Sequence, residues 1–166
     1  MYFNFISYLN FLLKSTNQHG VHSPFVFDYL TKCLYKKPKK SKDKTLDVLL
    51  KSISFFGFSS IKIYGNSVYE KEVKTSFPNS TFDGSETDML FFESIQNVNP
   101  LQLFSTYNLH NNSLIVLNNI NKNKSSMASW LDFIKSKKVA VSIDMYYCGV
   151  VFIRKEQRKE HFTIRI

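Results

Sequence analysis

The sequence predicts an α/β fold in which helices come first and a mostly parallel sheet, finishing in an antiparallel hairpin, follows. The first third of the chain carries apolar residues at helical spacing. The middle alternates short apolar runs, bounded by turn residues, with helical stretches, as parallel strands joined by crossovers do. The last apolar runs stand too close together for a helix to lie between them, so we expect these strands to pair antiparallel.

Three helices are expected before the first strand. Residues 2–13 repeat apolar side chains at the spacing of one helix face. Ser23 and Pro24 are residue types favoured at the N-cap and first position of a helix, which we expect to end near residue 35. A third helix is expected at residues 45–56, after a lysine-rich stretch.

The second part of the chain alternates strands and helices. Strands are expected at residues 61–64, 80–82, 89–92, 114–117, 139–144, 149–154 and 161–166. Helices are expected at residues 68–76, 100–108 and 125–137. The strands show little alternation of apolar and polar residues, which is typical of strands covered on both faces. We therefore divide the chain into an N-terminal helical section, residues 1–57, and an α/β domain, residues 58–166.

The composition bounds the class of protein. The chain has 166 residues, the usual size of one domain, and 43% of them are hydrophobic. Cys33 and Cys148 lack the CxxC spacing of metal and redox sites, and we expect both to be buried hydrophobes in a reducing compartment. The apolar start is too short to span a bilayer and lacks the features of a secretory signal. We expect a cytoplasmic protein whose first helix packs on the domain, with a helix lying on a membrane as the alternative.

The charge of the chain favours anionic partners. The formal net charge is +9, and part of the excess lies in one run that begins at Lys36 and ends at Lys44. Such a run is a candidate surface for nucleic acid or anionic lipid. The plainer interpretation is a solvated linker between two helices, and the sequence leaves both open.

Both ends of the chain resemble one protein family. The segment KSTNQHGVHSPFV at residues 14–26 and the tail GVVFIRKEQRKEHFTIRI at residues 149–166 resemble a bacterial branch of the class I S-adenosylmethionine-dependent methyltransferases. The resemblance implies a Rossmann-like methyltransferase fold with S-adenosylmethionine as cofactor, in a shortened chain. Two regions of the family are missing, one after the second helix and one between Gly84 and Asp88, where a helix and a strand would lie.

The resemblance places the cofactor at the turn after the first strand, where the backbone must approach the ligand closely. Gly65 is the glycine of this turn. Ile63 stands where the family has an acid, and Tyr69 stands where it has a second glycine. Asp83 follows Gly65 at about the spacing of a carboxylate that binds ribose hydroxyls. Because Asp-Gly is also a common turn pair, a plain turn at Asp83 is an equal alternative.

Some family members hold a divalent cation with carboxylates after the fourth and fifth strands. The first of these positions falls at Glu93, and the acidic pair falls at Asn118 and Asn119. Hard cations prefer charged oxygen ligands, so we expect no bound metal. We keep Glu93 with Gly65 and Asp83 as the candidate cofactor-binding residues.

His19 and His22 precede the second helix and are the candidates for a ligand pair or a general base. Our preferred interpretation is structural, with hydrogen bonds to backbone groups fixing the start of the helix. No catalytic residue is assigned. We expect a divergent methyltransferase-like protein with weak or no catalysis. The alternatives are a small active methyltransferase on an unknown small-molecule or macromolecular acceptor, and a basic module that binds nucleic acid or an anionic surface.

Overall fold

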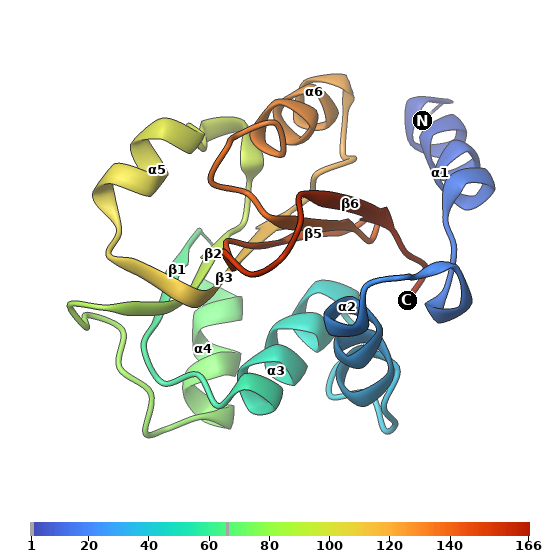
Figure 1. Ribbon diagram of the computed structural model, residues 1–166. Coiled ribbons are helices and arrows are strands. Elements are labelled where there is room, and N and C mark those ends of the chain that lie inside the picture. The colour runs from blue at the N-terminus through green and yellow to red at the C-terminus, as the bar shows by residue number, and fades with distance from the viewer. Residues whose placement is uncertain (1, 66) are drawn as a thin grey trace.

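The structure is a computed structural model that describes residues 2–65 and 67–166. A six-stranded sheet runs through it with helices on both faces (Figure 1). The strands are β1 Ile61–Tyr64, β2 Thr87–Phe92, β3 Leu109–Asn118, β4 Val141–Asp144, β5 Cys148–Phe152 and β6 Glu160–Thr163, in the order β1-β2-β3-β5-β4-β6. Strands β1, β2 and β3 are parallel, and β5 is antiparallel to both of its neighbours, β3 and β4. The expected α/β class and mostly parallel sheet are confirmed.

The end of the sheet differs from the expectation in one respect. The antiparallel pairing of β4 with β5 is confirmed, but β6 pairs parallel with β4 and was expected to pair antiparallel. Strand β5 already has β3 on one side and β4 on the other, so it has no free edge for β6. The chain therefore crosses to the outer edge of β4, where a strand that returns after β5 runs parallel to β4.

The strand expected at residues 80–82 is wrong. Thr81 makes a single bridge to Ser60, with backbone bonds to Ser59 and Ile61 of 2.7 and 2.8 Å. The chain then turns away, because the Ser60 hydroxyl donates to the carbonyl of Glu86 and holds the following loop at the start of β1. Strand β1 is consequently the edge of the sheet.

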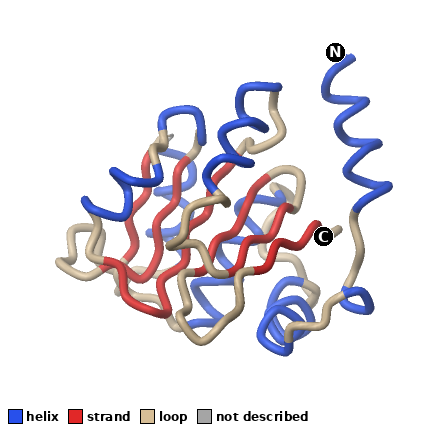
Figure 2. Tube along the Cα trace, turned by 45° about the horizontal axis from the view of Figure 1, so that its top comes forward, coloured by secondary structure: helices blue, strands red, loops and turns tan. Residues whose placement is uncertain are grey.

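The helices form two layers and an outlying arm. Helix α2 (Pro24–Tyr29) continues as a π-helical turn, Leu30–Leu34, and lies with α3 (Lys44–Phe56) and α4 (Ser67–Ser76) on one face. Helices α5 (Pro100–Thr106) and α6 (Lys124–Phe133) cover the other face. Helix α1 (Tyr2–Lys14) stands beside the sheet edge formed by β6, as both views show (Figures 1 and 2). Short 3-10 turns lie at Gln18–Gly20 and Ile95–Asn97. In the described part of the chain, no helix is both long and apolar enough to cross a membrane.

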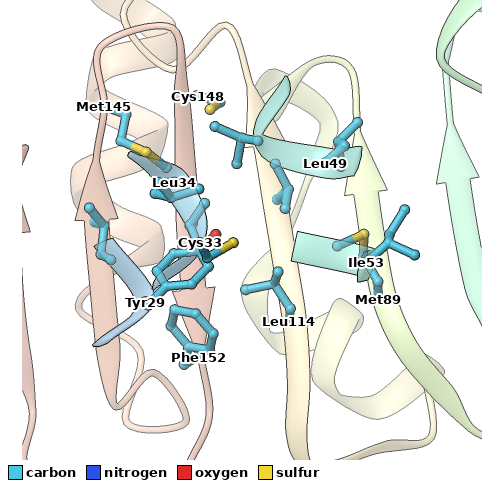
Figure 3. Packing of buried hydrophobic residues seen from close by; sticks show 14 of the residues in the cluster. Tyr29, Cys33, Leu34, Leu49, Ile53, Met89, Leu114, Met145, Cys148 and Phe152 are labelled. Atoms are coloured by element: carbon cyan, nitrogen blue, oxygen red, sulfur yellow. The ribbon is translucent and has the colours of Figure 1, made fainter. Parts of the chain in front are cut away.

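The N-terminal helices and the sheet share one core. Side chains from the α2 turn and α3 meet side chains from β2, β3 and β5 in Figure 3; those labelled include Tyr29, Cys33, Leu49, Ile53, Met89, Leu114 and Phe152. The Tyr29 hydroxyl is satisfied by Ser52 at 2.7 Å. Cys33 and Cys148 are buried free thiols, and burial raises the pKa of each to about 12, so both remain protonated and behave as small apolar groups.

A buried ion pair fixes the loop that leads into α3. The ammonium of Lys51 lies 2.9 Å from the carboxylate of Asp47 and donates to the carbonyl of Leu34. Asp47 also accepts the backbone N–H of Lys40 at 2.6 Å. Each charge therefore has several partners, as a buried pair requires. The result is that the lysine-rich loop is tied down at Lys40, four residues before the start of α3.

Candidate functional site

A cavity of about 440 Å³ lies at the carboxyl ends of β2 and β3. Its walls come from the start of α3, the start of α4 and the turn between β4 and β5. The lining residues are Lys42, Asp43, Lys44, Thr45, Tyr69, Glu93, Asn118, Asn119 and Tyr147. Ligands of open α/β sheets bind in the crevice outside the carboxyl ends of the strands, so this cavity is the candidate site.

A chain of hydrogen bonds joins α3, α4 and β3 at the cavity. Asp43 caps α3 by accepting the N–H of Leu46 at 2.8 Å, and its other oxygen accepts the Tyr69 hydroxyl at 3.4 Å. The Asn118 amide donates to the same hydroxyl at 3.1 Å. The Thr45 hydroxyl donates to the side-chain amide oxygen of Asn118 at 2.8 Å. Burial, assisted by the Asp43 carboxylate, raises the pKa of Tyr69 to about 12. Tyr69 therefore acts here as a neutral phenol that donates and accepts hydrogen bonds.

The end of β3 meets the end of β2 through Asn119. Its backbone is left-handed, with φ 58°, a conformation that asparagine adopts more readily than most residues. Its backbone N–H donates to Tyr147 at 2.8 Å, and its side chain donates to the Glu93 carbonyl at 3.2 Å. The structure thus brings Glu93, Asn118 and Asn119 together. In residues 2–65 and 67–166, no cluster of three His, Cys, Asp or Glu residues forms a candidate cation site.

Gly65 lies directly against Glu93. Its φ is 131°, and a β-carbon added there would come within 2.3 Å of the Glu93 β-carbon. The Glu93 N–H also donates to the carbonyl of Tyr64 at 2.9 Å. A side chain at position 65 would therefore push the two strand ends apart. Close packing of β1 on β2 accounts for the glycine.

Asp83 is not brought to the other two candidates. It is exposed and lies two residues after Thr81, which pairs with Ser60 at the amino end of β1. A β-carbon on the next residue, Gly84, would come within 2.6 Å of the Ser60 hydroxyl. Gly65 lies at the other end of β1, roughly 13 Å along the strand. The structure accordingly places Asp83 in a turn at the opposite end of the sheet from the cavity.

The two N-terminal histidines lie at the loop before α2. The backbone bonds there come from neighbouring side chains: Asn17 accepts the N–H of His19 at 3.0 Å, and Ser23 accepts the N–H of Val26. The His19 ring lies 3.3 Å from the Gln18 amide. Ser23 is confirmed as the N-cap of α2.

The lysine-rich run is mostly on the surface. Lys36, Lys37, Lys39, Lys40 and Lys42 are exposed, and Lys44 is partly buried. The Lys44 ammonium lies 4.6 Å from the centre of the Tyr147 ring. The run therefore joins an exposed basic loop to one wall of the cavity.

Sequence reasoning overlooked Asp43, Thr45 and Tyr147 as site residues. Asp43 had a readable signal, because an aspartate directly before a helical run is a favoured N-cap. Thr45 and Tyr147 carried none. They reach the cavity only because α3 begins at the carboxyl edge of the sheet and the turn after β4 lies at the same edge.

Comparison with known proteins finds no matching family model, no matching curated protein and no matching solved structure.

Proposed function

We propose that this chain is a divergent S-adenosylmethionine-dependent methyltransferase-like protein that has lost methyl transfer and binds a small polar ligand in the cavity between α3 and α4. One observation carries the proposal: Tyr69 lies on the cavity wall with its hydroxyl bonded to Asn118 and Asp43. The resemblance to the family expects a glycine at that position. The phenol ring of Tyr69 fills the space in which the cofactor would lie close to the backbone.

The remaining cofactor positions support the same proposal. The Asp83 carboxylate, which would bind ribose, lies at the amino end of β1. Ile63 is apolar and packs against the core. Only Gly65 and Glu93 meet at the cavity end of the sheet. Two of the expected contacts are too few to orient a cofactor and an acceptor in line, and orientation is the main source of acceleration in methyl transfer.

The charges around the cavity indicate the chemistry of the ligand. Lys42 and Lys44 supply ammonium groups, while Asp43 and Glu93 supply carboxylates. A ligand with both a carboxylate and an ammonium group would be complementary to this lining. A reducing compartment such as the cytoplasm belongs to the same proposal, because both cysteines are unpaired.

The first experiment is a calorimetric titration with S-adenosylmethionine and its demethylated product. We expect no heat of binding up to about 1 mM of either compound. Micromolar binding, or turnover with any acceptor, would contradict the proposal and favour a small active methyltransferase.

The binding role is tested with L-methionine as a zwitterionic probe, followed by NMR. We expect shifts of the side-chain amides of Asn118 and Asn119, and loss of these shifts in Glu93→Gln. Asp83→Asn is the matched control, because it removes the same charge at the other end of the sheet. Equal responses of the two variants would speak against binding in the cavity.

The exposed lysine loop favours a second candidate function, binding of nucleic acid. Lys36, Lys37 and Lys39 point charge into solvent outside the cavity. Affinity for nucleic acid through these residues must fall steeply as salt rises, because bound counterions are released. We expect the triple change of these lysines to glutamine to flatten the salt dependence measured by fluorescence anisotropy. An affinity that is flat between low and moderate salt in the unmodified protein would remove this candidate.

A further inference from the structure

A second cavity lies between α1 and α6, on the opposite face of the sheet from α3 and α4. Its volume is about 500 Å³. The views show α1 standing beside the sheet edge at β6 and α6 lying above the sheet (Figures 1 and 2). The walls are mainly apolar and comprise Phe3, Ile6 and Phe11 from α1 and Met127, Trp130 and Leu131 from α6. Apolar walls around a few polar groups are the usual composition of a small-molecule site.

The floor of this cavity carries a carboxylate without a cation. Asp144, the last residue of β4, accepts the Tyr146 N–H at 2.7 Å on Oδ1. The Asn121 amide lies 3.2 Å from Oδ1 and 3.4 Å from Oδ2, and within the described residues this long contact is the one hydrogen bond that Oδ2 accepts. Among the ion pairs of the described residues, none includes Asp144. A partly buried carboxylate in this position favours a positively charged or donating ligand group.

The groups that neighbour Asp144 do not supply this positive charge, so a ligand can supply it. Burial lowers the pKa of His161, which also lines the cavity, although the nearby Asp144 carboxylate acts to raise it, so the ring is mainly neutral near pH 7. The Nδ1 atom of His161 bonds to Ser142 at 2.9 Å. Lys14 lines the cavity from the last turn of α1, and its side chain is exposed to solvent. Burial raises the pKa of Asp144, as expected for a carboxylate with incomplete compensation.

We propose that the cavity between α1 and α6 binds an apolar amine, with its ammonium group on Asp144 and its hydrocarbon part against the side chains of α1 and α6. An ammonium group supplies both the opposite charge and the hydrogen bonds that Oδ2 lacks. The hydrocarbon part covers Ile6 and Leu131, which are 52% and 46% exposed. An anionic head group is disfavoured, because it would lie beside the Asp144 carboxylate.

The site is independent of the cavity between α3 and α4. The two cavities have no lining residue in common, and their walls come from different helices. Failure of the proposed methyltransferase-like function would therefore leave this inference untouched. The converse also holds.

The test uses octylamine, octanol and octanoate, which share one alkyl chain and differ in their head groups. With the unmodified protein at neutral pH, we expect octylamine to bind at least about tenfold more tightly than either other probe, measured by calorimetry. Equal affinity for all three probes, or tighter binding of octanoate, would overturn the proposal. This comparison needs no variant and so does not depend on how a variant folds.

Two variants locate the binding. Asp144→Asn keeps the acceptor for the Tyr146 N–H and should reduce the affinity for octylamine to that for octanol. Asp132→Asn is the matched control, since Asp132 is a 76% exposed carboxylate on α6 and does not line this cavity. Ile6→Asn should weaken all three probes by removing part of the apolar wall. An unchanged preference for octylamine in Asp144→Asn would refute the assignment of the ammonium group to Asp144.

Discussion

Two carboxylates at opposite ends of the same sheet have opposite surroundings. Asp88, near the amino end of β2, accepts the backbone N–H groups of Ser59 and Ser60, both at 2.8 Å. Its other oxygen lies 2.9 Å from the ring of His110 at the start of β3. Asp88 thus ties the amino ends of three adjacent strands together, whereas Asp144 lies at a carboxyl end and lines a cavity.

The difference shows how one residue type serves structure or binding according to its partners. The acceptor sites of Asp88 are filled by the protein, so its charge stabilises the fold. Those of Asp144 are only partly filled, by Tyr146 and Asn121, so its charge opposes folding slightly and is available to a ligand. Both cavities include residues at or just after the carboxyl ends of parallel strands, Asn118 in one and Asp144 in the other. Asp88 lies at the amino ends instead.

The largest expected effect is the loss of Asp88. Asp88→Ala removes hydrogen bonds to a charged acceptor from three strand ends, and we expect the free energy of unfolding to fall by about 2–3 kcal/mol in urea denaturation. Asp83→Ala is the control, since this exposed aspartate should change the free energy of unfolding by less than about 0.5 kcal/mol. Similar losses in both variants would show that the bonds of Asp88 contribute little.

A smaller loss is expected from the hydrogen-bonded network at the carboxyl end. Tyr69→Phe removes the hydroxyl that Asn118 and Asp43 share, and should lower the free energy of unfolding by about 1 kcal/mol. Tyr147→Phe is the control, because Tyr147 meets Lys44 through its ring face, which phenylalanine keeps. A Tyr69→Phe protein as stable as the control variant would indicate that the network is weak in solution.

Asp144→Asn should behave in the opposite way to the loss of Asp88. Removing a charge that burial disfavours should leave the free energy of unfolding unchanged or raise it by up to about 1 kcal/mol. Urea denaturation of the ligand-free protein measures this. A loss of more than about 1 kcal/mol would mean that Asp144, like Asp88, has its bonding complete within the protein.

The smallest expected effect is on the pH dependence of stability, which should differ between Asp88 and Asp144. Although burial acts to raise it, the hydrogen bonds from Ser60, Ser59 and His110 lower the pKa of Asp88 below 3.8. The stability that Asp88 contributes is therefore complete above pH 3.8 and lost as the pH falls through the lower, folded-state value. Burial raises the pKa of Asp144 above 3.8, so its cost is present at neutral pH and is relieved as the pH falls towards 3.8.

Unfolding measured from pH 7 to pH 3 should separate the two carboxylates. The difference between the unmodified protein and Asp144→Asn should shrink mainly above pH 3.8, while the difference from Asp88→Asn should shrink mainly below it. Differences that shrink in the same pH range for both variants would contradict the assignment of opposite pKa shifts.

Local sequence signals located most of the helices and strands. The apolar spacing predicted α3 to within one residue of its start, and the strand at residues 61–64 has the predicted bounds. Ser23 and Pro24 start α2 as their residue types indicate. These features depend on capping, backbone preference and apolar periodicity within a few residues, and such information is present in the sequence itself.

Only the tertiary structure decided which strands pair and which candidate site residues come together. Strands β3 and β4 occupy the two edges of β5, so β6 pairs with the free edge of β4. This choice of partner sets the direction of β6. Asp83 had a suitable spacing from Gly65, yet a bridge from Thr81 to Ser60 holds its turn at the wrong end of β1. The sequence by itself determined the type and order of most helices and strands, whereas the contact of Gly65 with Glu93 emerged only in the folded chain. Only the packing of α1 and α6 around Asp144, and of α3 and α4 around Tyr69, decided where cavities form, because these contacts join residues far apart in the chain.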